Sequence, residues 1–138
     1  MPPFDKDFFM AAGLLFERER GVPLDPSDHD GIRDAGLDSA TTGEVAARVW
    51  TALSEDLSEE SRGAAYWALG KSYRKEEKDR LVSALKIEVG RRAAVAYQIM
   101  IALDNLDEPV FSPDRSGYSV LEAAQNLADA ERYLAAIR

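Results

Sequence analysis

At 138 residues the chain is long enough for one domain with a sizeable core, and we expect a single domain over residues 1–138. The absence of cysteine excludes disulfides, thiolate catalysis and thiolate metal sites. Together with a start that shows no secretory signal, it favours a cytoplasmic protein. The net charge of −8 argues against nucleic acid as the partner and favours a basic protein.

The negative charge is unevenly distributed along the chain. Residues 1–69 hold 6 basic and 14 acidic side chains, whereas residues 70–138 hold 11 of each. An acidic surface steers the encounter with a positively charged partner, but negative charge also simply keeps proteins soluble. Both interpretations stay open from the charge alone.

The first predicted helix spans residues 4–20. Asp5 is the expected N-cap, and Phe4 can pack on Phe9 as a hydrophobic staple. Gly21 and then Pro23 end the helix. Its expected buried stripe consists of Phe8, Ala12, Leu15 and Phe16.

Residues 21–40 are rich in Gly, Pro, Asp and Ser, which predicts a loop with at most one short helix over residues 27–35. The Asp28–Gly31 stretch has a faint likeness to a calcium loop. In that register, however, Pro26 would occupy the first ligand position and Leu37 the position of the bidentate glutamate. We therefore expect a solvated acidic loop that is open to a partner, and no metal site.

Two N-cap signals mark the next pair of helices. Thr41–Glu44 is a capping box, and the helix that it opens should bury Val45, Ala46, Val49, Trp50 and Leu53. Ser58 can cap the following helix, which we expect to continue to Arg74 with Trp67 lying over Lys71.

A charge run over residues 71–80 follows, which is either a solvated turn or a basic patch for an acidic partner. A further helix with Leu81, Val82, Leu85 and Val89 buried leads to the central helix of residues 91–106. Between residues 93 and 103 only Gln98 is polar, so neighbours must cover this helix on most sides. The apolar run is too short to span a bilayer.

A second long loop after Leu106 carries Phe111 and Tyr118. Ser119–Glu122 has the pattern of another capping box and would open the last helix. The expected core stripe of that helix is Ala123, Leu127, Ala130, Leu134 and Ile137. Since no segment alternates as a strand does, we predict an all-α fold of about six helices, paired antiparallel in a HEAT-like stack or compact bundle without a sheet.

Little in the chain points to catalysis. It has one histidine and no cysteine, and no glycine-rich loop follows a strand. Ser83–Lys86 matches the S-x-x-K pattern, but the companion motifs of that enzyme class are missing and chance explains it better. We therefore expect no enzyme, no catalytic residues, no bound metal and no cofactor.

Two stretches repeat at a distance of 29 residues, Arg62–Ala65 and Arg91–Ala94, and each opens an alanine-rich helix. This resembles the HEAT-like repeat, in which helix pairs stack and the inner helix begins with Arg and paired Ala. Glu122–Ala124 would be a degenerate third copy, so that the resemblance covers residues 42–137. A departure is that the second copy lacks the Ala-Leu-Gly ending found at Ala68–Gly70.

The whole chain also resembles the helical immunity proteins of bacterial contact-dependent growth-inhibition systems. The resemblance depends on the small size, the acidic balance, the stretch Ala102–Phe111 and the stretch Arg115–Ser119. It implies a cytoplasmic protein that binds the toxin domain of a related inhibitor, often a nuclease. It transfers no binding residues, because such families share little sequence.

We therefore expect an immunity or antitoxin-type protein that covers the active site of a cognate basic toxin domain. Its contacts would be acidic residues of the two loops, with three aromatic anchors: Asp25, Asp28, Asp30, Asp34, Asp104, Asp107, Glu108, Phe111, Tyr118 and Trp67. The alternative is a HEAT-like scaffold for an endogenous protein. A nucleic-acid binder using residues 71–92 is disfavoured by the overall charge.

Overall fold

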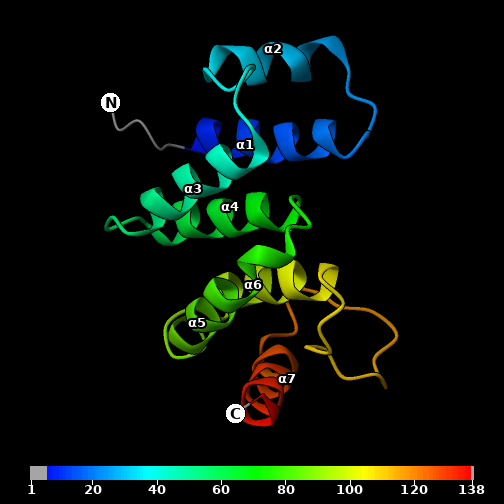
Figure 1. The fold of residues 1–138 in the computed structure, drawn as a ribbon. Coiled ribbons are helices and arrows are strands. Elements are labelled where there is room, and N and C mark those ends of the chain that lie inside the picture. The colour runs from blue at the N-terminus through cyan, green and yellow to red at the C-terminus, as the bar shows by residue number, and fades with distance from the viewer. Residues whose placement is uncertain (1–5, 138) are drawn as a thin grey trace. The chain divides into compact units, whose positions relative to one another are not determined.

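The computed structural model describes residues 6–137, and all regular structure in this range is helical (Figure 1). The elements are α1 (Lys6–Glu19), α2 (Pro26–Asp34), α3 (Thr42–Leu53), α4 (Glu59–Gly70), a 3₁₀ turn (Lys75–Glu77), α5 (Lys78–Glu88), α6 (Ala93–Asn105) and α7 (Ala123–Ala136). The prediction of an all-α fold is confirmed. The described residues hold seven α-helices rather than about six, because the short segment after Asp25 forms α2.

The chain folds as two compact units, one ending at Ser72 and the other beginning at Tyr73. Unit 1 contains α1 to α4, and unit 2 contains α5 to α7. Each unit has its own buried apolar side chains. The organisation of the chain as a single domain stays a prediction.

In unit 1, α1 lies between α2 on one side and α3 and α4 on the other, and α1/α2 and α3/α4 form antiparallel pairs (Figure 1). The stripe predicted for α1 is confirmed, since all four of its side chains are buried. The predicted cap Asp5 and the partner of the staple, Phe4, lie outside the described residues.

The contact between α1 and α4 depends on a glycine. A Cβ atom built at Gly13 would lie 2.6 Å from Cζ3 of Trp67, closer than real Cβ contacts come. The indole therefore packs directly on the backbone of α1. The predicted contact of Trp67 with Lys71 is also present, with Nζ 5.4 Å from the ring centroid.

The N-cap predictions at Thr41 and Ser58 are confirmed. The Thr41 hydroxyl accepts a hydrogen bond from the backbone N–H of Glu44 at 3.1 Å, and the Glu44 carboxylate accepts one from the N–H of Thr41 at 3.4 Å. Ser58 accepts from the N–H of Ser61 at 3.1 Å. The predicted continuation of this helix to Arg74 is wrong: α4 ends at Gly70, and Tyr73 has a left-handed φ of 50° that no α-helix accommodates.

In unit 2, α6 packs against both α5 and α7. Its buried side chains are Val95, Ala96, Ile99, Met100, Ala102 and Leu103, and among its residues only Ala94 is fully exposed. The expectation that neighbours cover it on most sides is confirmed. No helix of residues 6–137 combines the length and the apolar composition that crossing a bilayer requires.

The start and the core side of α7 differ from the prediction. The helix begins at Ala123 and its N-cap Glu122 makes no side-chain cap, so the predicted capping box at Ser119 is wrong. Of the predicted core stripe only Ala130 is buried, while Ala123 and Ile137 are exposed. The buried residues of α7 are instead Asn126, Asp129, Ala130 and Tyr133.

Candidate functional site

Helix α2 and its N-cap Asp25 hold four of the seven acidic residues predicted as partner contacts. Two of them close its N-terminus: the Asp25 carboxylate accepts the backbone N–H of Asp28 at 3.0 Å, and the Asp28 carboxylate accepts that of Asp25 at 3.4 Å. Hydrogen bonds from the Ser27 hydroxyl and from the Asp28 backbone lower the pKa of Asp25. Asp25 and Asp28 therefore hold α2 together, and a D-x-x-D capping box was readable in the sequence.

The other end of α2 is fixed to unit 1 by a glycine turn. Gly36 has φ +75°, and the N–H of Leu37 reaches back to the carbonyl of Ile32 at 3.1 Å. Ile32 and Leu37 are both fully buried, and Ile32 is the only buried residue of α2. The other residues of α2 are therefore exposed or partly exposed.

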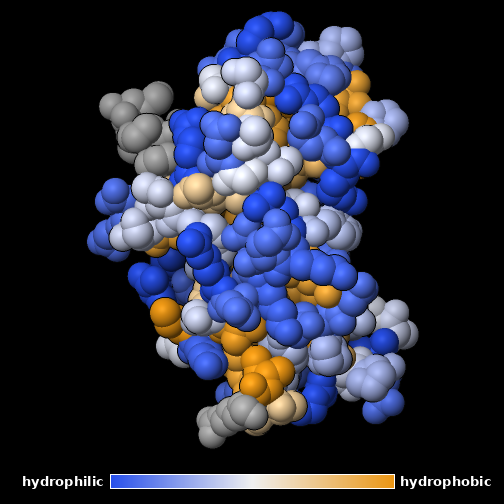
Figure 2. Space-filling model, viewed as in Figure 1, coloured by the Kyte–Doolittle hydropathy of each residue, from blue (hydrophilic) through white to orange (hydrophobic). Residues whose placement is uncertain are grey.

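Two acidic side chains remain on the exposed side of α2, one helical turn apart. Asp30 forms an ion pair with Arg33, and both side chains are more than half exposed. Asp34 is exposed and makes no ion pair with a described residue. The surface over α2 is largely hydrophilic in Figure 2. Asp30 and Asp34 are thus the carboxylates of α2 that a partner can reach without dismantling the helix.

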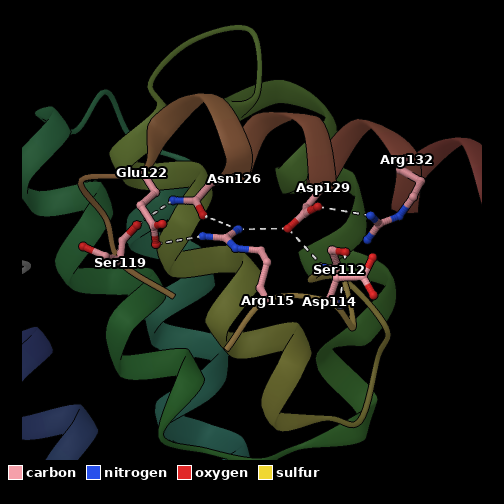
Figure 3. A network of polar contacts seen from close by, with 8 residues as sticks. All are labelled: Ser112, Asp114, Arg115, Ser119, Glu122, Asn126, Asp129 and Arg132. Carbon is pink, nitrogen blue, oxygen red and sulfur yellow. Dashed lines mark hydrogen bonds and ion pairs between the residues drawn. The ribbon is translucent and has the colours of Figure 1, made fainter. Parts of the chain in front are cut away.

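Unit 2 contains a polar network that the sequence did not predict. Arg115, in the loop between α6 and α7, donates to Asn126, Asp129 and Glu122, each at 2.9 Å (Figure 3). The backbone N–H of Ser112 donates to the Asp129 carboxylate at 3.1 Å, and so does Arg132. The network binds the loop along one side of α7.

These contacts shift the pKa values of Asp129 and Arg115. Burial alone would raise the pKa of Asp129, but the hydrogen bonds from Arg115 and from the Ser112 backbone, with the charge of Arg132, lower it. The hydrogen bond to Asp129 in turn raises the pKa of Arg115. Asp129 is only 6% exposed, and because its pKa is lowered its carboxylate is charged at neutral pH.

The predicted aromatic anchors of unit 2 belong to the same loop. Phe111 is buried, and its ring stacks on that of Tyr118 with 3.8 Å between centroids. The guanidinium carbon of Arg115 lies 5.7 Å from the Phe111 centroid and 5.4 Å from the Tyr118 centroid. Phe111 is therefore used inside the unit, whereas Tyr118 keeps 39% of its surface exposed.

The predicted acidic turn Asp104–Glu108 also makes contacts within unit 2. Glu108 accepts the Tyr133 hydroxyl at 2.7 Å and lies 3.4 Å from Nζ of Lys78. Burial raises the pKa of the Tyr133 phenol, and the hydrogen bond to Glu108 raises it further. Asp107 has a left-handed φ of 65° and is exposed. Burial, then the nearby charge of Asp107, raises the pKa of Asp104.

The predicted contact residues thus fall into two sets, one in each unit: α2 with its N-cap and Trp67 in unit 1, and the last turn of α6 with the loop that follows it in unit 2. Trp67 packs on Gly13 and is only partly exposed. Partner contact by these residues stays a prediction. Within residues 6–137 no three histidine or carboxylate side chains group closely enough to hold a metal ion.

An exposed apolar surface at α7 was not predicted from the sequence. Leu121 is 90% exposed and Val120 41% exposed, immediately before the helix begins. The sequence did show apolar residues at helical spacing along α7, but in the structure these residues are only partly buried.

No protein-family model, no curated protein and no solved structure matches the chain. Its function is therefore inferred from its own surfaces.

Proposed function

We propose that this protein is an immunity-type protein, which binds a cognate basic toxin domain, such as a nuclease, and covers its active site. The observation that carries the proposal is the exposed carboxylate pair Asp30 and Asp34 on α2, within a unit whose first 69 residues hold 6 basic and 14 acidic side chains. No catalytic role is assigned to any residue.

The mechanism follows from the chemistry of the client. A nuclease active site is electropositive because it holds phosphates. Carboxylates on a rigid helix can take the positions of those phosphates, and the negative field of unit 1 raises the rate of encounter. Covering the active site then prevents nucleic acid from entering it.

Charge reversal on α2 tests the proposal. The double variant Asp30→Lys/Asp34→Lys should fold, because neither side chain is buried and the cap residues Asp25 and Asp28 are unchanged. With a toxin fragment encoded immediately upstream of the gene, we expect the wild type to protect co-expressing cells. The double variant should bind the fragment at least about tenfold more weakly, the typical loss for disrupted interfacial charge pairs.

A matched control separates contact from net charge. Glu55→Lys/Asp56→Lys changes the net charge by the same amount on an exposed turn between α3 and α4 of the same unit. This control should keep most of the affinity. Equal weakening by both double variants would remove α2 from the interface, and failure of the wild type to protect cells would contradict the immunity function. Recovery of a housekeeping protein instead of a toxin would favour the scaffold alternative.

A further inference from the structure

Helix α7 turns an apolar side away from its unit. Asn126, Asp129, Ala130 and Tyr133 face inward, so the opposite side of the helix carries the residues that we call the α7 outer face. These are Ala124, Leu127, Ala128, Glu131, Leu134 and Ala135, of which the alanines are exposed and the leucines partly exposed. Figure 2 shows hydrophobic side chains gathered over the region of α7. Helices α5 and α6 both contact α7, yet the residues of this face remain exposed or partly exposed.

The turn before α7 adds an apolar anchor that is held in place. Asn126 donates to the carbonyl of Ser119 at 2.9 Å, and Arg115 pairs with Glu122 at 2.9 Å (Figure 3). These two contacts bracket Val120 and Leu121. Leu121 is thus presented to solvent at 90% exposure by a fixed turn rather than by a free chain end. A preorganised apolar side chain of this kind loses little entropy on binding.

The charges around the face indicate what covers it. Residues 104–137 hold seven acidic side chains and two basic ones, Arg115 and Arg132. Both arginines are engaged within the unit through Asp129. Glu131 lies on the face itself and pairs with no described residue. Of the seven carboxylates, Glu108, Glu122 and Asp129 are paired within the unit, so Glu131 is the unpaired charge on the apolar face itself.

We infer that the α7 outer face docks a basic amphipathic helix of the partner protein, with Leu121 as an anchor at one end. Small alanines let a second helix approach closely, the leucines pack against its apolar side, and the Glu131 carboxylate meets its basic side. A second copy of this chain fits less well, because two such faces would bring two unpaired Glu131 carboxylates together. The inference rests on the proposed function for the basic protein partner, and it adds the docking surface and the element that binds there.

A designed peptide tests this surface directly. The probe is a labelled synthetic helix of about 18 residues with Leu along one side and Lys along the other, long enough to cover α7. Fluorescence anisotropy compares wild type with Ala128→Arg, Leu121→Lys and Met10→Lys. All three variants add one positive charge at an exposed site, and Met10, 48% exposed on α1 of the other unit, is the control. Far-UV circular dichroism checks that each variant is folded.

We expect Ala128→Arg to weaken binding of the peptide at least about tenfold and Leu121→Lys about threefold or more, with Met10→Lys close to wild type. A peptide with Glu in place of Lys should not bind. Equal binding by wild type and Ala128→Arg, or an equal loss in Met10→Lys, would overturn the inference. So would a wild-type dimer, seen by sedimentation, that Ala128→Arg dissociates.

The outcomes for the two proposals are distinguishable. Peptide binding that depends on Ala128, without protection from any toxin, would leave the docking surface standing and contradict the immunity function. A toxin fragment that is neutralised equally by wild type and Ala128→Arg would support the immunity function and overturn the docking surface.

Discussion

At the scale of single residues, Gly13 decides how closely α1 and α4 approach. The indole of Trp67 occupies the space that a side chain at position 13 would need. We predict that Gly13→Ala lowers the free energy of unfolding by about 1–2 kcal/mol, because the cost of overpacking exceeds the gain in helix propensity. Urea unfolding followed by tryptophan fluorescence measures it, since Trp50 and Trp67 both belong to unit 1.

The matched control is Gly63→Ala in α4. Gly63 is also inside a helix, but apart from its chain neighbours and its own helix backbone no atom lies within 4 Å of a Cβ built there. This substitution should therefore raise the free energy of unfolding by about 0.5–1 kcal/mol through helix propensity alone. If the two variants change stability in the same direction, the close approach of Trp67 does not govern the packing of α1.

The role of Gly13 was not predictable from the sequence, although the stripe around it was. Phe8, Ala12 and Leu15 follow the helical period, and periodicity is a property of neighbours along the chain. The partner of Gly13 is a tryptophan 54 positions later. The sequence shows that a glycine is present, but only the packed helices show what fills its space.

At the scale of elements, the sequence predicts the start of a helix correctly where both residues of the cap lie close together in the chain. The predicted box at Thr41 closes within four residues and is present; the box at Asp25 is equally local, although it was not predicted. Ser119–Glu122 has the same spacing, yet the Glu122 carboxylate pairs with Arg115, which comes from the preceding loop. Because Glu122 pairs with Arg115, its carboxylate does not close the capping box predicted at Ser119.

The core side of α7 was mispredicted for the same reason. The apolar stripe through Leu127 and Leu134 has helical spacing, so periodicity places it inside. Burying Asn126 and Asp129 instead is possible because Arg115 and Ser112 satisfy them. The predicted contacts Phe111 and Glu108 are likewise held within the unit by Tyr118 and Tyr133.

This network makes the stability of unit 2 depend on pH. The folded pKa of Asp129 lies below its unfolded value of about 3.9, so its stabilising contribution is present above that value and is lost as the pH falls through the folded pKa. We predict that the free energy of unfolding of the wild type falls as the pH drops below about 4. Asp129→Asn should already be less stable at pH 7, by about 3 kcal/mol, and should show a flatter decline.

Urea unfolding followed by circular dichroism at several pH values measures both slopes. Asp114→Asn is the control, because Asp114 is an exposed carboxylate of the same loop without a described ion-pair partner. It should keep the pH dependence of the wild type. An unchanged slope in Asp129→Asn would show that other carboxylates carry the acid sensitivity.

At the scale of the whole molecule, charge and apolar surface have different kinetic roles. The net charge of −8 acts over about one Debye length and so affects the encounter, whereas the α7 outer face acts only on contact. Electrostatic steering changes association rates, and buried apolar contacts mainly change dissociation rates. The two properties can therefore be separated by rate measurements with the Leu/Lys peptide.

We predict that the association rate of this peptide falls about tenfold between 20 and 500 mM salt, while its dissociation rate changes much less. Each Asp→Lys change adds two positive charges, so Asp30→Lys/Asp34→Lys has a net charge of −4 and should show a shallower salt dependence. Ala128→Arg should instead raise the dissociation rate. Stopped-flow fluorescence measures both rates. An association rate independent of salt would show that the negative charge serves solubility alone, and a double variant with a faster dissociation rate would place α2 in the contact itself.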